Sequence, residues 1–452
     1  MSKETENRDS IDFGTTPIRQ LFMKMFWPTL LSMLCASVMN VADGIFVGQG
    51  VGSDALAAVN IAAPLYMIAT GISLMFGSGA SIVAAIHLSQ DNTKAARINM
   101  TQAYIVGLTI ITAITLYTLF RIEDVAYAFG SSERLISLVT TYIYYILPCL
   151  PFAVIDLISV FMIRLDGSPK YAMYCTAIPS ALNFVLDYVM VFPMGMGLKG
   201  AAIATTISQG IGAMMALFYV VAISEKLRPY RLKISETSAK LTLRNTSYMM
   251  KVGFPSLIGE FAISCMMIVG NYAFMSVLGE DGVASFSIVC YCMPFVFMGA
   301  NSVSQAMQPV LSYNYGARQE DRIKESLKIC IVSTLSFGVL LTIAGYGFSY
   351  GIAGLFIDKA AHAYELTGKG FPLFSSGLIF FVLNVMLIGY FQSIEKTKHS
   401  TMYMLLRGFI IIIPCFIILP KLIGEKGLWL ANPLSELITF AVIAITWPKK
   451  DK

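Results

Sequence analysis

Two neighbouring stretches, YAMYCTAIPSALNFVLDYVMVF (171–192) and GAAIATTISQGIGAMMALFYVVAI (200–223), indicate the architecture of the whole chain. Each is long enough to cross a bilayer, which takes about 20 largely apolar residues. Together they contain a single charged residue, Asp187. The same character extends over all 452 residues, of which 56% are hydrophobic and only 13% are charged. A soluble domain carries roughly twice that share of charge. The sequence therefore predicts a polytopic membrane protein.

Apolar runs of this kind recur along the chain and predict an all-α protein with twelve transmembrane helices. They cover residues 20–47, 55–86, 98–120, 134–163, 171–192, 200–223, 248–278, 283–311, 327–350, 371–393, 401–420 and 427–447. An even number of spans places both termini on one side of the membrane. Most of the 32 Lys and Arg residues fall on that side, many of them in 224–247. The positive-inside rule then predicts that both termini are cytoplasmic.

The two halves of the chain resemble each other at one constant offset, close to half the chain length. This offset aligns Met23 with Met250, Pro28 with Pro255, Phe129 with Phe356, Pro193 with Pro420 and Gly200 with Gly427. Six spans in each copy predict two parallel six-helix lobes related by an internal pseudo-two-fold repeat, an arrangement common in secondary transporters. The predicted segments are a tail (1–17), the N-terminal lobe (18–223), a basic linker (224–247), the C-terminal lobe (248–447) and a tail (448–452).

Carboxylates inside the spans are the first candidates for function. A charge in the bilayer centre costs at least about 2.5 kcal/mol on insertion scales, so each is a functional candidate by default. Five carboxylates fall within the spans: Asp43, Asp156, Asp187, Glu260 and Glu436. The interior is therefore predicted to be biased toward negative charge, which suits a cationic substrate, a proton relay or Na⁺.

Asp187 has polar companions at helical spacing. Asn183 precedes it by four residues and shares its helix face. Thr205, on the next span, can add a hydroxyl group. Carboxylate, amide and hydroxyl oxygens form the kind of cluster that hard cations prefer, and buried carboxylates also bind protons. In the alternative interpretation, Asn183 and Thr205 merely satisfy the hydrogen bonds of Asp187.

Asp43 ends the first span, in MNVADGIFVGQG (39–50), fifteen residues after Pro28. Proline removes a backbone donor from a helix, so Pro28 is a predicted hinge. Bending there would couple the state of Asp43 to the shape of the cavity. Alternatively, Asp43 is an interfacial aspartate at a helix end.

The remaining carboxylates, Glu260, Asp156 and Glu436, are predicted to belong to a substrate site or a second coupling site. In the repeat, Glu436 corresponds to Gln209. Neither Asp43 nor Asp187 has an acidic counterpart in the second half, so the N-terminal half is predicted to have a charge site that its copy lacks.

The sequence indicates no cofactor. It contains no nucleotide-binding loop of the GxxxxGK[ST] type, which leaves an ion gradient as the predicted energy source. The three histidines are too scattered for a metal site, and the eight cysteines lie mostly in apolar runs as small buried hydrophobes.

Several local patterns accompany the twelve spans. They are VADGIFVGQGVGSDALAAVN (41–60), RLDGSPKYAM (164–173), ALNFVLDYVMVF (181–192), GLKGAAIATTISQ (197–209), QPVLSYNYGARQEDRIK (308–324), LLRGFIIIIPCFIILP (405–420) and GEKGLWLANPLSE (424–436). Together with the two parallel halves, these patterns resemble the multidrug and toxic compound extrusion (MATE) family over residues 17–447. The variants look most similar to the bacterial branch that includes the staphylococcal multidrug exporter.

This resemblance implies an antiporter of the bacterial plasma membrane that expels organic cations or other toxic compounds in exchange for H⁺ or Na⁺. In MATE proteins with an N-lobe ion site, an aspartate ends the first span, an Asn-xxx-Asp pair lies on the fifth and a threonine on the sixth. These positions fall on Asp43, Asn183, Asp187 and Thr205.

Another branch of the family pairs a seventh-span glutamate, shortly after a proline, with a tenth-span aspartate. Glu260 after Pro255 fits the first requirement, but 371–392 contains no carboxylate. The resemblance therefore leaves a C-lobe ion site incomplete.

Two other functions stay open. A lipid-linked oligosaccharide flippase of the same superfamily often has more spans and a cationic cavity, so twelve spans and an acidic interior favour the antiporter. An integral-membrane transferase would need a catalytic His/Asp cluster in a sizeable loop, and most loops here are short. The prediction is therefore a transporter, not an enzyme, that acts on small cationic or amphipathic molecules and not on nucleic acid.

Overall fold

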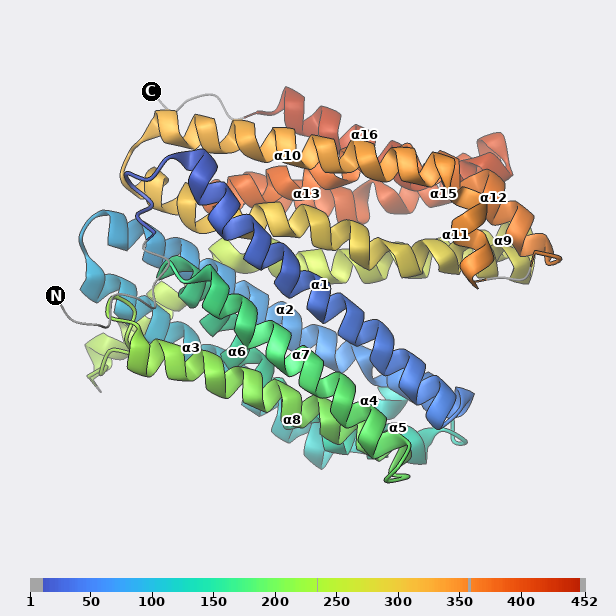
Figure 1. Cartoon of the computed structure of the whole chain (residues 1–452), viewed down its shortest axis with the longest axis horizontal. Helices are drawn as coiled ribbons and strands as arrows, with labels where there is room; N and C mark the ends of the chain where they lie inside the picture. Colours follow the sequence, from blue (N-terminus) through green and yellow to red (C-terminus); the bar gives the residue numbers. More distant parts are fainter. Residues whose placement is uncertain (1–10, 234, 357–358, 448–452) are drawn as a thin grey trace. The chain divides into compact units, whose positions relative to one another are not determined.

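A computed structural model describes residues 11–233, 235–356 and 359–447, and all regular structure in these ranges is helical (Figure 1). The chain forms two compact units. Unit 1 comprises residues 1–257 and 309–320, and unit 2 comprises 258–308 and 321–452. Most of the predicted N-terminal tail and all of the predicted C-terminal tail lie outside the described residues.

Unit 1 contains the first six predicted spans. Its helices are α1 (Ile18–Gly50), α2 (Ser53–Ser89), α3 (Thr93–Phe120), α4 (Ile122–Ala128), α5 (Ile136–Ile146), α6 (Cys149–Leu165), α7 (Pro169–Val191), α8 (Gly197–Phe218) and the π-helix η2 (Tyr219–Ile223). Helices α5 and α6 are bent by 45° and together form the fourth span. The break contains Pro148, which has no backbone N–H to donate to the preceding turn.

The 81-residue helix α9 (Glu236–Gly316) is a hairpin of two spans. Its backbone leaves the helical region at Gly279, with φ 65° and ψ −150°, a conformation that glycine adopts readily. The rings of Phe274 and Phe286 stack with their centroids 4.6 Å apart, whereas twelve residues of a straight helix span about 18 Å. The chain therefore folds back at Gly279, and α9 supplies the seventh and eighth spans.

Unit 2 continues with the remaining spans. Its helices are α10 (Glu320–Gly347), α11 (Ser349–Phe356), α12 (His362–Ser375), α13 (Leu378–Ser393), α14 (Thr397–Leu405), the π-helix η3 (Leu406–Ile410), α15 (Ile412–Ile423) and α16 (Glu425–Ile445). Helices α12 and α13 are bent by 47°. Phe274 and Trp429, whose rings meet edge to face at 5.0 Å, belong to the buried aromatic core of this unit.

The described residues confirm the predicted fold class. Nine helices are long and apolar enough to cross a bilayer, and the two bent pairs raise the number to eleven. This number counts α9 as one span, although α9 folds back at Gly279 and supplies two. The total is therefore twelve spans. The two largest differences in span boundaries are at the start of α9 and at the start of α12. Helix α9 begins at Glu236, inside the predicted linker 224–247, and the tenth span begins at His362 instead of residue 371.

Candidate functional site

The four residues of the predicted N-terminal cluster come together in unit 1. Asp43 lies on α1, Asn183 and Asp187 lie on α7, and Thr205 lies on α8. Asn183 and Asp187 are completely buried. The Asn183 Nδ2 atom donates to Thr205 Oγ1 at 3.4 Å, and the carboxyl groups of Asp43 and Asp187 interact directly.

Four oxygen atoms of this cluster lack donors in the described part of the protein. Both carboxyl oxygens of Asp187, one of Asp43 and the amide oxygen of Asn183 are buried without a hydrogen-bond partner. Two ionised carboxylates in contact repel each other, and burial increases the cost because water no longer solvates them. A shared proton, or a small hard cation, would remove this repulsion. The arrangement is thus chemically suited to binding H⁺ or Na⁺.

Pro28 lies within α1, which is a single helix from Ile18 to Gly50. Two hydroxyl groups near this proline bond to carbonyls of the same helix: Thr29 Oγ1 donates to the Met25 carbonyl at 2.8 Å, and Ser32 Oγ donates to the Pro28 carbonyl at 2.9 Å. Asp43 lies fifteen residues farther along the same helix, about 22 Å by helix rise. A bend at Pro28 would therefore move Asp43 relative to the start of α1.

A second carboxylate of unit 1, Asp156 on α6, is separate from the Asp43–Asp187 pair. Gln209 on α8 donates through Nε2 to Asp156 Oδ2 at 3.1 Å. The other carboxyl oxygen, Oδ1, is buried and has no hydrogen-bond partner among the described residues. Asp156 therefore links the fourth and sixth spans through one hydrogen bond.

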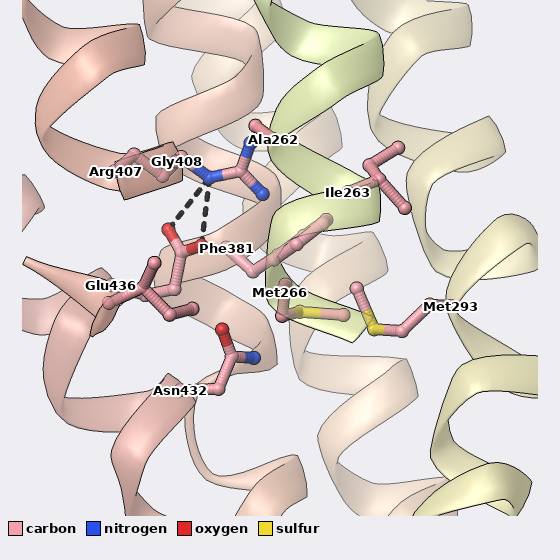
Figure 2. Close-up of a pocket in the computed structure, with 10 residues that line it drawn as sticks. Ala262, Ile263, Met266, Met293, Phe381, Arg407, Gly408, Asn432 and Glu436 are labelled. Carbon is pink, nitrogen blue, oxygen red and sulfur yellow. Dashed lines mark hydrogen bonds and ion pairs between the residues drawn. The ribbon is translucent and has the colours of Figure 1, made fainter. Parts of the chain in front are cut away.

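Glu436 in unit 2 belongs to a buried ion pair (Figure 2). Arg407 Nε donates to its two carboxylate oxygens at 2.8 and 3.0 Å. Asn384 Nδ2 donates to Glu436 Oε2 and to the Glu436 backbone oxygen, both at 2.8 Å. The guanidinium group also lies over the ring of Phe381, 4.1 Å from its centroid. The side chains of Arg407 and Glu436 are only 5% and 2% exposed.

In the sequence, Arg407 lies near the start of the eleventh predicted span (401–420), and nothing there singles out Asn384. The structure buries Arg407 in η3, a π-helical turn between α14 and α15. A signal for this pair exists in the sequence, because an arginine and a glutamate both occur within apolar runs, where each needs a partner.

A small cavity of about 20 Å³ adjoins this ion pair, which is room for one water molecule. Met266, Met293 and Phe381 line it together with Asn432, whose amide has no hydrogen-bond partner among the described residues (Figure 2). Glu260 is half-buried on α9 and does not line this cavity.

Twelve spans in two repeats are an arrangement that is common among membrane transporters. The MatE family model matches residues 28–189 and again residues 255–417. The two matches begin at Pro28 and Pro255, which are the residues that the sequence repeat aligns with each other. The chain therefore belongs to the MatE family.

Relatives and solved structures agree with this assignment. The chain is 22% identical over 448 residues to the multidrug export protein MepA of Staphylococcus aureus strain N315, covering 97% of this chain and 96% of the relative. It is 20% identical to MepA of Staphylococcus saprophyticus, covering 94% and 92%. Among solved structures, the outward-facing conformation of a multidrug resistance MATE family transporter of the MOP superfamily matches with a TM-score of 0.87 and 21% identity, covering 95% of each chain.

Proposed function

We propose that this protein is a secondary active antiporter that exports organic cations in exchange for H⁺ or Na⁺. The contact between the carboxyl groups of Asp43 and Asp187 carries the proposal. Because both oxygens of Asp187 and one of Asp43 are buried with no donor among the described residues, the pair has the chemistry of a site for a proton or a small cation. The relatives described as multidrug export proteins support the class of substrate.

The proposed cycle uses this pair as the exchange point. A drug cation enters from the cytoplasm while the carboxylates are free. Binding of H⁺ or Na⁺ from outside, with Asn183 and Thr205 supplying further oxygens, cancels the charge that attracts the drug. Bending of α1 at Pro28 accompanies the change and releases the drug. An ion drives this step only if it binds the two states with different affinity.

The proposal also includes an orientation in the membrane and roles for the remaining carboxylates. The lobes 18–223 and 248–447 would rock against each other in a bacterial plasma membrane, with both termini in the cytoplasm. Because 224–247 carries many of the basic residues, the positive-inside rule supports this orientation. Glu260, Asp156 and Glu436 would serve a substrate site or a second coupling site.

The direct test uses everted vesicles that contain the protein and a fluorescent organic cation such as ethidium. A pH gradient and a Na⁺ gradient are imposed separately. Dye movement under one gradient, absent from vesicles without the protein, is the expected result and names the coupling ion. If no organic cation moves under either gradient while a labelled lipid-linked oligosaccharide is flipped, the flippase alternative is correct and the antiporter proposal is wrong.

Replacing Pro28 with alanine is expected to slow ion-driven efflux by about tenfold. Proline in a helix interior costs about 3 kcal/mol, because it removes a hydrogen bond and crowds the preceding turn. Alanine restores the bond and makes bending less favourable, so the bent state becomes rarer. Initial dye-transport rates, normalised to the amount of protein in the vesicles, measure the effect.

The matched control is Pro64→Ala, because Pro64 also lies inside a membrane-spanning helix, α2, and has no proposed role. Wild-type rates from Pro28→Ala, or an equal loss from both variants, would rule out a specific hinge at Pro28.

A further inference from the structure

Each repeat contains a buried acid that is hydrogen-bonded to a side-chain amide, with the acid and the amide exchanged between the two copies. In unit 1 the acid is Asp156 on α6 and the amide is Gln209 on α8. In unit 2 the amide is Asn384 on α13 and the acid is Glu436 on α16. Gln209 and Glu436 occupy equivalent positions at the offset of the sequence repeat, and Asp156 and Asn384 depart from it by a single position.

The elements that carry these pairs correspond as well. Helix α6 follows a 45° break in the fourth span, and α13 follows a 47° break in the tenth. Helices α8 and α16 are the last spans of their repeats. A glycine of positive φ stands at matching positions where they begin: Gly197 (56°) is the first residue of α8, and Gly424 (63°) directly precedes α16. The two pairs are therefore counterparts in the fold, not isolated polar contacts.

The pairs differ in the cation next to the carboxylate. The Glu436 carboxylate accepts a hydrogen bond from Arg407 Nε at 2.8 Å, in addition to the hydrogen bond from the Asn384 amide. The position of unit 1 that corresponds to Arg407 is Ser180, whose hydroxyl donates to the backbone carbonyl of its own helix at 2.8 Å. Asp156 forms no ion pair with any described residue, and its only hydrogen bond comes from Gln209.

The other groups that face Asp156 do not neutralise it by contact. Arg164, the cation that acts on it electrostatically, lies eight residues farther along α6, about 12 Å by helix rise. The titratable groups from the packed elements are a phenol and two thiols, namely Tyr104 on α3, Cys149 on α6 and Cys175 on α7. The Tyr104 hydroxyl forms a hydrogen bond with the Ser159 hydroxyl at 2.6 Å, and not with Asp156.

We propose that Asp156 is a proton-binding site, occupied in the folded protein, whereas its counterpart Glu436 stays ionised. A buried carboxylate without a cation in contact lowers its free energy by taking up a proton, because the neutral acid loses far less solvation on burial. The neutral acid keeps the hydrogen bond from Gln209, since its carbonyl oxygen still accepts. Glu436 has no such need, because Arg407 and Asn384 compensate its charge.

The N-terminal repeat would then bind a proton at Asp156, separately from the Asp43–Asp187 pair, which is proposed to bind H⁺ or Na⁺. The assignment of a proton to Asp156 does not depend on the proposed ion coupling. It can be tested by spectroscopy on the purified protein, without any measurement of transport.

Infrared spectroscopy of the purified protein in detergent at neutral pH tests this assignment. The C=O stretching band of a protonated carboxyl group is well separated from the bands of an ionised carboxylate. The difference spectrum between the wild type and Asp156→Asn is expected to show the loss of one protonated-acid band, which shifts in heavy water. The difference spectrum for Glu436→Gln is expected to show the loss of ionised-carboxylate bands instead.

A second variant keeps the test decisive if Asp156→Asn folds poorly. Gln209→Met removes the hydrogen bond and retains the acid, so the protonated band is expected to move to higher wavenumber without losing intensity. If Glu436→Gln folds poorly, the double variant Arg407→Met/Glu436→Gln removes both charges and serves as its replacement. Loss of only ionised-carboxylate bands in Asp156→Asn, or no band shift in Gln209→Met, would overturn the proposal.

Discussion

The Asp187→Asn variant is expected to lose ion-driven efflux, with initial rates at least tenfold lower and near those of vesicles without the protein. Coupling between two ligands in one protein typically amounts to about 1–3 kcal/mol, or roughly 5- to 150-fold in affinity. Because the proposed ion site consists of Asp43 and Asp187, removing one carboxylate removes the source of that coupling. The amide is close in size to the carboxylate, so the loss should come from charge and not from packing.

The same variant should retain its fold. Both carboxyl oxygens of Asp187 lack a hydrogen-bond partner among the described residues, so the substitution breaks no observed bond to them. Asn183 also keeps its bond to Thr205. We therefore expect wild-type expression and thermal unfolding together with lost transport. Asp43→Asn is expected to behave in the same way, since it removes the other member of the pair.

The matched control is Asp124→Asn, which also neutralises one aspartate. Asp124 is 62% exposed and pairs only with its neighbour Arg121 on the surface, and such surface pairs contribute about 0–1 kcal/mol. Its transport rate should equal that of the wild type. Full gradient-driven efflux in both Asp187→Asn and Asp43→Asn would show that the exchange site lies elsewhere in the chain.

The spans were predictable because bilayer crossing leaves a strong signal in the sequence. Because the bilayer core contains no water, each span must be an apolar run of about 20 residues. The sequence repeat then assigns six of these runs to each lobe. The boundaries were less predictable. Helix α9 continues back to Glu236 through polar residues, because a helix extends beyond the bilayer wherever its backbone bonds are satisfied. The start of α12 at His362 has the same explanation.

The polar network of unit 2 was harder to predict than the N-terminal cluster. Asn183 and Asp187 share one helix at a spacing of four, so sequence alone shows that they are neighbours. Arg407 and Glu436 lie on different helices and meet only through packing. Arg407 also lies in the π-helical turn Leu406–Ile410, which contributes to the position of its side chain. No local sequence pattern predicts such a turn. Long-range side-chain contacts of this kind become visible only when the spans are assembled.

Removing one member of the Arg407–Glu436 pair is expected to destabilise the protein strongly. Breaking a buried ion pair by truncating one partner typically costs about 3–5 kcal/mol, because the other charge stays buried without compensation. In Arg407→Met, Glu436 would keep only the hydrogen bond from Asn384. Phe381 would also lose the guanidinium group that covers its ring. The free energy of unfolding, measured by denaturation in detergent micelles, should fall by that amount.

The double variant Arg407→Met/Glu436→Met distinguishes the cost of an unpaired buried charge from the loss of the ion pair itself. Replacing both ions by apolar residues of similar volume is often neutral, so the double variant should recover most of the stability that Arg407→Met loses. The control is Arg134→Met, which breaks an arginine–aspartate contact of 2.6 Å with Asp54 whose side chains are 70% and 50% exposed; its expected cost is below about 1 kcal/mol. Should Arg407→Met cost no more than Arg134→Met, the interior around Glu436 must solvate a bare carboxylate, and Glu436 would then be free to exchange ions. Stability therefore decides whether Glu436 is a fixed ion or a second coupling site.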